Sequence, residues 1–549
     1  MSDVRVREVR RITGRHPLLP GAGAAAELWG DDVSRALTAL EPRLAEAQRA
    51  VGGEGAITLR PWPGGASVAF EAPVDLLEQA VLALEWALGE DDAAALVEIA
   101  AQAEAARSPA LLTLLAAAEA LNLPAFFDDE GLTVGLGARG RTWALDALPS
   151  PDALPGLGLG RIPFVFVTGT NGKTTSARAI ARIAAEAGLV AGNTSSDGVV
   201  VRGEWIERGD WTGPGAARTL LRHPELTFAV LETARGGLLR RGLALNGADG
   251  ALLTNVSDDH LGDWGLFTLE DMAWAKATVA EGVRPGGAVV VNGGCPLCQA
   301  AVAARLPAGV RSLRFSARQD PSAAAWVQDG QLWLGDAPLA PLDELPITLG
   351  GLASHNVENA LGAAALAAAV GLPRHAINAG LRGLRPSVAE SRGRLNMFSV
   401  GGAWAIVDFC HNPDGMRRLA SVARAWPAKR RLVLLGQSGD RSQEQLTALT
   451  REALAAAPDR VIVKELPRHL LGRAPGEMTE VFSAILRGLG LPETALGQAA
   501  NEPEAVAQAL AWAKPGDLLL LLIHEELDAT LAALMAAGAV AIDGVPAGR

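Results

Sequence analysis

The stretch "FVFVTGTNGKTTSARAIARIAA", residues 164–185, constrains the fold more than any other part of the chain. An apolar run ends at Thr168, a glycine-rich turn follows, and apolar residues then recur at helical spacing. A buried strand that enters a helix through such a turn is typical of a phosphate-binding loop, because the start of the helix offers free backbone N–H groups. The stretch therefore predicts an α/β domain built around an anion site.

The spacing within this turn differs from the common P-loop, in which two glycines are separated by four residues. Here Gly169 and Gly172 enclose only two. Backbone N–H groups and the helix dipole can hold phosphate oxygens, Lys173 can reach the terminal phosphates, and a threonine hydroxyl can bind Mg²⁺. We interpret the loop as a nucleoside triphosphate site rather than as a turn that binds nothing. Its predicted binding residues are Gly169, Thr170, Asn171, Gly172, Lys173, Thr174 and Thr175.

The overall charge and hydropathy exclude several classes of function. A net charge of -12 and a pI of about 5.3 disfavour nucleic acid as a partner. The start "MSDVRVREVRRITG" places charges where a signal peptide needs an apolar core, so we expect a cytoplasmic protein. The most apolar stretches, 360–373 and 518–523, are shorter than the ~18 residues that a membrane span requires. We therefore expect no membrane partner.

Sequence periodicity divides the chain into four parts. Residues 1–90 alternate strands with two helices, as in a small N-terminal α+β domain, and 91–160 form a helical segment with a glycine- and proline-rich linker. Short apolar runs alternate with helical patterns in 161–385 and again in 386–549. The expected fold class is thus α/β multidomain, with a central P-loop domain and a C-terminal Rossmann-like α/β domain.

The run T-G-T-N-G-K-T-T resembles the nucleotide loop of the Mur ligase family, which includes folylpolyglutamate synthases and the C-terminal half of cyanophycin synthetase. The stretches "LETARGGLLRRGLAL", "LLTNVSDDHLGDWG", "SHNVENALG", "SRGRLN", "VDFCHNPDGM" and "KELPRHLLGRAPGE" are similar to that half. Residues 1–90 resemble its N-terminal domain more weakly. The resemblance implies that 161–385 is the central ATP-binding domain and that 386–549 is the C-terminal domain of a Mur ligase.

The resemblance also implies a reaction and its catalytic residues. A Mur-type ligase uses ATP to phosphorylate a carboxylate, and an amine then attacks the acyl phosphate to give an amide and ADP. By resemblance the catalytic residues are Lys173, Glu232, His260 and Lys276, and the ligands of two Mg²⁺ ions include Thr175, Glu232 and His260. Lys276 matches a lysine that this family often carries in carbamylated form.

Four further residues match the family's ATP contacts. Asn356 and Asn359 lie three apart, hence on one helix face, and match residues on the adenine side of ATP. Arg394 and Asp408 match contacts to phosphate and ribose. Phe409 departs from the tyrosine that is usual after this aspartate, so one hydroxyl hydrogen bond is absent. Charged residues further on could contact the incoming amino acid or could simply be solvated: Arg441, Lys464, Glu465, Arg473 and Glu477.

The expected reaction follows from what the resemblance covers. Segment 91–160 is too short for the ATP-grasp domain that builds the aspartate backbone in cyanophycin synthetase. We expect a ligase that adds arginine or a similar amino acid to an aspartate-type small-molecule or peptide carboxylate acceptor. A separate ATP-grasp ligase in the same pathway and a homo-oligomer are further expected partners. Two alternatives stay open: a folylpolyglutamate or poly-γ-glutamate synthase-like γ-glutamyl ligase, and an inactive nucleotide-binding partner of another ligase.

Overall fold

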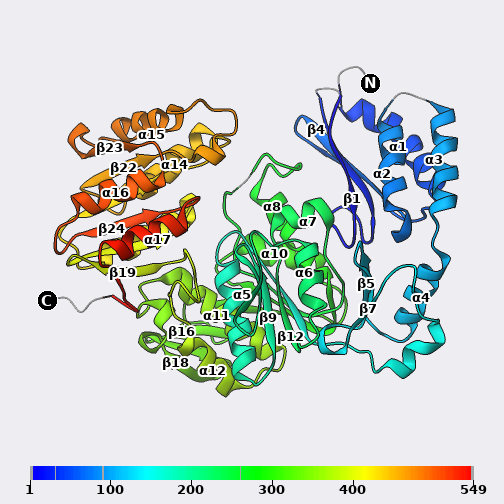
Figure 1. The fold of residues 1–549 in the computed structure, drawn as a ribbon, viewed down its shortest axis with the longest axis horizontal. Coiled ribbons are helices and arrows are strands. Elements are labelled where there is room, and N and C mark those ends of the chain that lie inside the picture. The colour runs from blue at the N-terminus through cyan, green and yellow to red at the C-terminus, as the bar shows by residue number, and fades with distance from the viewer. Residues whose placement is uncertain (1–3, 31–32, 90–91, 260, 546–549) are drawn as a thin grey trace.

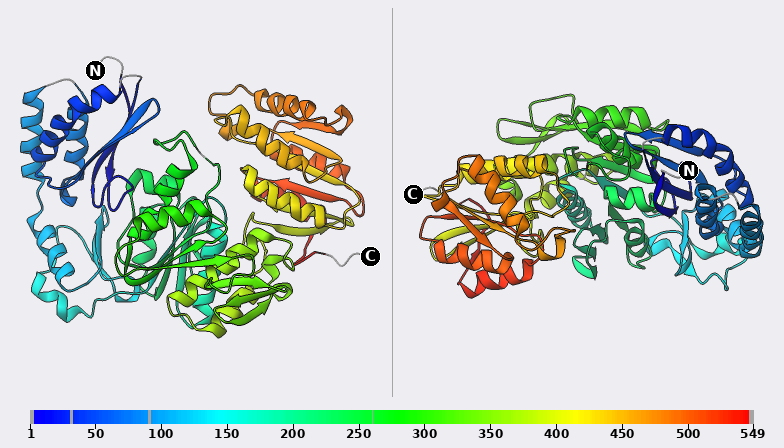
Figure 2. Two further views of the ribbon diagram at one scale, coloured as in Figure 1. Left: turned by 180° about the vertical axis from the view of Figure 1, so that it is seen from behind. Right: turned by 90° about the horizontal axis from the view of Figure 1, so that it is seen from above.

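The computed structural model describes residues 4–30, 33–89, 92–259 and 261–545, and the strands of these residues form four sheets. Figure 1 shows the N-terminal and C-terminal parts on opposite sides of a central sheet domain, and the view from behind in Figure 2 shows the same arrangement. The two outer parts therefore approach the central domain from different sides.

The N-terminal part is an antiparallel sheet with helices packed on one face (Figure 1). Strand order is β1-β2-β4-β3, with β1 (Arg5–Ile12), β2 (Gly23–Trp29), β3 (Ile57–Trp62) and β4 (Gly65–Glu71). The helices are α1 (Val33–Ala50), α2 (Leu77–Leu88) and α3 (Ala93–Ala106). The sequence analysis missed β2, because "GAAAELW" contains no β-branched residue and alanine has a low strand propensity.

A small segment connects this part to the central domain. Helix α4 (Pro109–Ala120) is followed by a three-stranded antiparallel sheet of β5 (Ala125–Asp128), β6 (Gly131–Val134) and β7 (Arg141–Trp143). A side-chain cluster that includes Leu111, Leu114, Leu132 and Val134 fills the space between α4 and this sheet. The expected helical segment is present, and the glycine-rich stretch after it forms a sheet with its own small core.

The central domain has an eleven-stranded sheet whose middle strands are parallel. The order is β11-β10-β9-β12-β8-β13-β14-β15-β16-β17-β18 among the described residues. The strands are β8 (Phe164–Thr168), β9 (Ala191–Ser195), β10 (Gly198–Val201), β11 (Glu204–Arg208), β12 (Phe228–Glu232), β13 (Ala248–Leu253), β14 (Val283–Asn292), β15 (Arg311–Ser316), β16 (Ala325–Gln328), β17 (Gln331–Leu334) and β18 (Ala337–Pro341). Strand β8, which leads into the predicted loop, pairs in parallel with β12 and β13.

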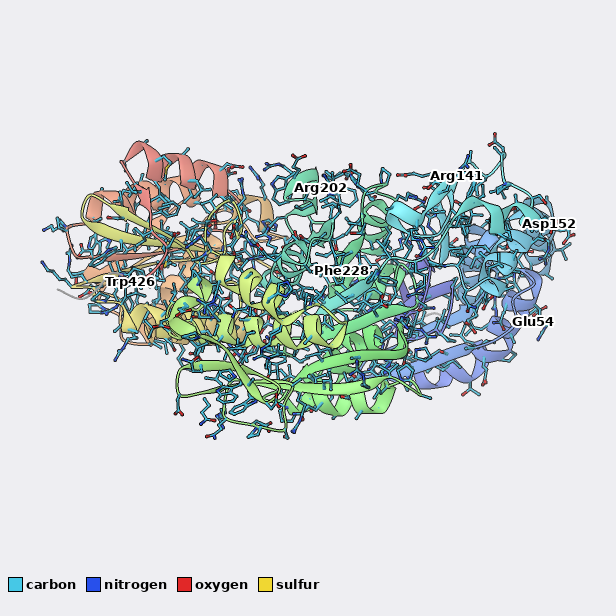
Figure 3. The ribbon with its side chains drawn as sticks, turned by 90° about the horizontal axis from the view of Figure 1, so that it is seen from below. Glu54, Arg141, Asp152, Arg202, Phe228 and Trp426 are labelled. Atoms are coloured by element: carbon cyan, nitrogen blue, oxygen red, sulfur yellow. The ribbon has the colours of Figure 1, made fainter. Side chains whose placement is uncertain are left out.

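Helices cover both faces of this sheet and bury two separate cores. One face carries α5 (Lys173–Glu186), α11 (Ser354–Ala369) and α12 (Arg374–Gly383). The other carries α6 (Pro214–Leu221), α7 (Arg235–Arg241), α9 (Thr278–Glu281) and α10 (Pro296–Arg305), with α8 (Leu269–Lys276) packed against α7 and α10. Figure 3 shows Phe228 of β12 in the interior of this domain. A doubly covered parallel sheet places ligands at the carboxyl ends of its strands.

The C-terminal part is a second α/β sheet of order β23-β22-β21-β24-β20-β19-β25. Its strands are β19 (Asn396–Val400), β20 (Ala403–Asp408), β21 (Arg431–Leu435), β22 (Arg460–Lys464), β23 (Leu496–Ala499), β24 (Leu518–Leu522) and β25 (Val540–Ala541). Helices α13 (Pro413–Ala425), α14 (Gln443–Leu454) and α15 (Glu477–Gly488) pack on one face, and α16 (Glu502–Trp512) and α17 (Leu527–Ala536) on the other.

The predicted fold class is confirmed: the chain is an α/β multidomain protein with a small N-terminal α+β part. The four domain boundaries given by the sequence stay predictions. Within the described residues, no helix is both long and apolar enough to cross a bilayer.

Candidate functional site

The glycine-rich loop joins the carboxyl end of β8 to the first turn of α5. Gly172 caps the helix with a φ of 83°, in the left-handed region that glycine adopts without steric cost. A Cβ atom at this position would lie 2.0 Å from Oδ1 of Asn359. The loop can therefore follow this path only with glycine at its final position, where α11 comes close behind it.

Residues after the neighbouring strand β13 hold the loop in place. The backbone N–H groups of Thr170 and Asn171 donate to the main-chain and side-chain oxygens of Asn255 at 2.9 Å. The Thr254 hydroxyl donates to the Asn171 carbonyl at 2.6 Å. The sequence analysis quoted this strand end only within the stretch "LLTNVSDDHLGDWG" and missed its role in fixing the loop.

Three side chains, one from the end of β12 and two from the start of α5, meet beside the loop. The Glu232 carboxylate, at the end of β12, accepts a hydrogen bond from the Thr174 hydroxyl at 2.8 Å. Burial raises the pKa of Glu232, and the Lys173 ammonium, the Thr174 hydroxyl and Arg394 partly offset this effect. Lys173 Nζ lies above the loop and donates to the Thr170 carbonyl at 2.8 Å. A buried carboxylate, a hydroxyl and an ammonium thus converge at the start of α5.

Lys276, at the end of α8, approaches the same loop from the other face of the sheet. Its side chain is 4% exposed, and Nζ donates to the Gly169 carbonyl at 2.8 Å. Burial, together with the charges of Lys173 and Arg235, lowers the pKa of Lys276 well below its ordinary value. A lysine with a lowered pKa carries an amine that is neutral more of the time, which is the form that reacts with electrophiles.

A cavity of about 700 Å³ encloses the predicted site residues that the structure describes. It is lined by the whole loop from Gly169 to Thr175 and by six further residues: Glu232, Lys276, Asn356, Asn359, Arg394 and Asp408. His260 lies outside the described residues. Thr175 lines the cavity, but it is the preceding hydroxyl, that of Thr174, that contacts the carboxylate of Glu232. The metal role of Thr175 stays a prediction.

Helix α11 supplies the two asparagines on the face that the spacing predicted. Asn359 Nδ2 donates to Asn356 Oδ1 at 3.1 Å, and Asn356 Nδ2 donates to the Ile347 carbonyl at 2.9 Å. Both side chains are about 95% buried. Since Asn359 also packs behind Gly172, this pair connects one wall of the cavity to the phosphate loop.

The C-terminal part contributes the opposite wall. Asp408, at the end of β20, accepts hydrogen bonds from the backbone N–H groups of Leu395 and Cys410 at 2.7 and 2.8 Å. Burial raises the pKa of Asp408, and Arg394 partly offsets this effect. The Arg394 guanidinium lies 4.4 Å from the centroid of the Phe409 ring. The aromatic ring that replaces the expected tyrosine thus orients an arginine that lines the cavity.

The start of α13 also contacts the phosphate loop directly. Asn412 Nδ2 donates to Asn171 Oδ1 at 2.9 Å, and Asn171 Nδ2 donates to Asn412 Oδ1 and Asp414 Oδ2 at 3.2 and 3.3 Å. Arg418 pairs with Glu358 of α11 at 2.9 Å. The contacts of Asn171 join residues about 240 positions apart, and the Arg418–Glu358 pair joins residues 60 apart, so the sequence alone gave no sign of them.

The charged residues for which the sequence analysis left open a contact with the incoming amino acid lie outside this cavity. Lys464 is fully buried and pairs with Glu502 at 2.6 Å. Glu465 accepts from the Gly476 backbone N–H, and Arg473 pairs with Glu477. Arg441 lies 3.8 Å from Asp259. None of these charged residues of the C-terminal part lines the described cavity, and their contact with an incoming amino acid stays a prediction.

Helix α7 brings three arginines to the cavity that the sequence did not single out. Arg235, Arg240 and Arg241 line its side nearest the N-terminal part. Strand β1 and the turn after it hold α7 in place: Arg10 Nε donates to the Leu239 carbonyl at 2.8 Å, and the Thr13 N–H donates to the Arg241 carbonyl. The "LETARGGLLRR" stretch contained these arginines, but their position depends on how α7 docks.

Comparison with known proteins agrees with this architecture. The Mur ligase middle domain matches residues 167–367, and the Mur ligase glutamate ligase domain matches 393–522. Cyanophycin synthetase of Nostoc sp. is 34% identical over 375 residues, which cover 66% of this chain and 41% of that protein. Cyanophycin synthetase of Crocosphaera subtropica is 37% identical over 59% of this chain and 38% of its own length. The chain thus matches about two-fifths of the length of these relatives.

A solved bifunctional folylpolyglutamate synthase/dihydrofolate synthase with Mn, AMPPNP and L-glutamate bound shares the fold, with a TM-score of 0.52 and 22% identity. The alignment covers 68% of this chain and 89% of that structure. The two matched domains contain the loop, Glu232, Lys276 and the asparagine pair on one side and Arg394 and Asp408 on the other. The chain belongs to the Mur ligase family of ATP-dependent ligases.

Proposed function

We propose that this chain is an ADP-forming amide ligase that phosphorylates the carboxylate of an acidic acceptor and joins it to the amine of an amino acid. The observation that carries the proposal is the convergence of Lys173, Glu232 with Thr174, and Lys276 on one glycine-rich loop inside a single cavity. Phosphoryl transfer needs an anion cradle, a mobile cation and a carboxylate for metal binding, and this arrangement offers each of them.

The residues beside the loop fit a magnesium ion. No group of three or more histidine, cysteine, aspartate or glutamate side chains that could hold a metal exists among the described residues. Mg²⁺ suits such a site, since it is bound through one or two carboxylates, water and substrate phosphates rather than by a full protein cage. Glu232 and the Thr174 hydroxyl would hold it, with Thr175 and His260 as further proposed ligands. When bound, the ion would neutralise charge on the phosphates.

We assign the remaining residues the roles that the resemblance to the Mur ligase family implies. The loop N–H groups and Lys173 would hold the β- and γ-phosphates, and Asn356 and Asn359 would bind the base side of the nucleotide. Arg394 and Asp408, from across the domain junction, would bind phosphate and ribose. The neutral amine of Lys276 can add carbon dioxide, and the resulting carbamate would place a negative charge next to Gly169, where it can support a second metal ion.

The acceptor side of the cavity supports an acidic substrate. Arg235, Arg240 and Arg241 line it on the face away from the nucleotide-binding asparagines, and guanidinium groups suit carboxylate recognition. Arginine as the incoming amino acid rests on the similarity to cyanophycin synthetase alone, since the acidic residues first suggested for its side chain lie outside the cavity.

A mass-spectrometric screen tests the proposal. The purified protein is incubated with ATP, Mg²⁺, each of several acceptors (an aspartate peptide, a glutamate peptide, a folate) and each amino acid. We expect one product heavier by one amino-acid residue, with ADP and phosphate released in equal amounts, and no product with Lys173→Ala. Formation of AMP and pyrophosphate would contradict the mechanism. Tight Mg-ATP binding without ligation of any pair would favour the inactive nucleotide-binding alternative.

A further inference from the structure

A second cavity lies where three parts of the chain meet, and no residue of the phosphate loop lines it. It has a volume of about 440 Å³, within the range of about 300–1,000 Å³ that small-molecule sites occupy. The end of β1, the start of α2, the β5 strand and the segment after α7 surround it. We call it the junction cavity, defined by Arg11, Arg15, Asp75, Phe127 and Arg218 together with residues 243–246.

The junction cavity contains a buried cation without a matching anion. Arg218 is only 7% exposed, and among the described residues its side chain has one hydrogen bond, a long one of 3.4 Å from Nη2 to the Thr13 carbonyl. Its Nε has no hydrogen-bond partner in the described part of the chain. The nearest carboxylate, Asp128, is already bound by both Nη atoms of Arg222. A buried guanidinium without an anion is unfavourable, and an anionic ligand would relieve that cost.

Asp75, a second residue of the cavity wall, also has an unmatched polar atom among the described residues. Asp75 uses Oδ2 to accept from the Ser108 N–H at 2.9 Å, while its buried Oδ1 has no partner among the described residues. Arg15, a further wall residue, pairs with Glu281 through Nη1 and leaves Nε without a partner. Among the described residues, the lining of the cavity thus includes two arginines with unsatisfied donors and an aspartate with an unsatisfied carboxylate oxygen.

The charge balance of the walls identifies the chemical class of the ligand. Arginines and carboxylates both line the cavity, and Glu78 lies 3.8 Å from Arg11, so neither sign dominates. A simple anion would satisfy only Arg218, and a simple cation only Asp75. Between the charged walls, Leu115, Phe126 and Phe127 form an apolar surface. The complementary ligand carries a carboxylate, an ammonium group and an apolar portion.

We propose that the junction cavity is a second binding site, which takes a small zwitterion: an α-amino acid or dipeptide whose carboxylate binds Arg218 and whose ammonium binds Asp75. The site is separate from the proposed ligation site, because the two cavities have no lining residue in common. Arg240 and Arg241 of α7 line the nucleotide cavity, whereas residues 243–246 directly after α7 line the junction cavity.

Titration calorimetry on the full chain without ATP tests this site, with leucine and alanyl-leucine as probes. N-acetyl-leucine, which lacks the ammonium, and leucinamide, which lacks the carboxylate, serve as comparisons. We expect single-site binding of a zwitterionic probe and affinity at least about tenfold weaker for either comparison compound. Absence of heat from both zwitterions up to about 10 mM, or equal binding of N-acetyl-leucine, would overturn the proposal.

Variants assign the binding to this cavity. Arg218→Met and Asp75→Asn should each weaken the probe at least about tenfold, since each removes one of two charged contacts. Arg202→Met is the matched control, because Arg202 lies exposed on the central domain and does not line the cavity (Figure 3). Lys173→Ala should bind the probe normally, which separates this site from the proposed ligase reaction. Unchanged affinity in both Arg218→Met and Asp75→Asn, with normal melting curves, would place the probe elsewhere.

Discussion

Replacing Gly172 by alanine tests whether the contact between the phosphate loop and α11 governs nucleotide binding. Gly172 has a φ of 83°, and an added Cβ would lie 2.0 Å from Asn359 Oδ1, far inside van der Waals contact. Two separate costs follow: the left-handed backbone conformation of alanine, and the displacement of either the loop or Asn359. Only the second cost should disturb the cavity.

Gly188, just beyond the other end of α5, provides a control for the first cost. Its φ is 81°, almost the same as that of Gly172, but no atom lies within 4 Å of an added Cβ. An alanine in the left-handed region costs about 1–2 kcal/mol. For a domain of this size that corresponds to a fall in melting temperature of about 2–4 °C per kcal/mol. Gly188→Ala should show this fall and keep normal ATP binding.

Gly172→Ala should show the same fall in stability and, in addition, a large loss of function. A displacement of about 1 Å in a phosphate-positioning loop can cost about 10²-fold in rate. Thermal melting, ATP affinity by calorimetry and ADP release are measured on both variants. If Gly172→Ala and Gly188→Ala lose stability equally and both keep full ATP affinity, the loop tolerates the collision, and its contact with Asn359 does not govern nucleotide binding.

Three other substitutions address the charged residues of the site. Lys173→Ala should keep its melting temperature but lose at least about 10²–10³-fold in turnover, and near-normal turnover would contradict the loop assignment. Glu232→Gln should raise the magnesium concentration that activity requires. Because burial raises the pKa of Glu232, protons should compete with Mg²⁺ for this carboxylate in the unaltered protein as the pH falls. This pH dependence should vanish in the variant. In carbon dioxide-free buffer, Lys276→Met should raise thermal stability while lowering activity. Because the pKa of Lys276 is lowered in the folded protein, the unfolded chain binds more protons at this lysine below pH 10.5. The gain in stability on substitution should therefore be larger at pH 6 than at pH 9. An equal gain at the two pH values would contradict burial of the amine.

Local patterns were sufficient to predict much of the site. The strand that ends at Thr168, the helix that carries Asn356 and Asn359, and the strand-end position of Glu232 each follow from periodicity within a few residues. That these residues share one site was implied by the resemblance to the Mur ligase family rather than by their spacing. The structure brings them into one cavity.

Features that depend on exact orientation or on distant contacts were not predictable in the same way. Thr174 and Thr175 are adjacent in the motif, but consecutive residues of a helix point about 100° apart, and only docking of α5 decides which hydroxyl faces Glu232. The arginines of α7 reach the cavity because β1 binds the carbonyl groups at the end of that helix. Strand β2 forms from an alanine-rich sequence because its neighbours β1 and β4 supply the pairing.

The contacts of Asn171 connect the placement of the C-terminal part to the geometry of the phosphate loop. The Asn171 side chain exchanges hydrogen bonds with Asn412 of the C-terminal part, and the Asn171 backbone N–H donates to Asn255 of the central domain. This one residue of the phosphate loop therefore contacts both domains. Arg418 makes a parallel connection to Glu358 on α11, the helix that packs behind Gly172. Movement of the C-terminal part would therefore alter the loop and its supporting helix together. Water hydrolyses an acyl phosphate. A ligase therefore wastes less of this intermediate if its phosphate loop adopts the binding conformation only when the domain that closes the cavity is in place.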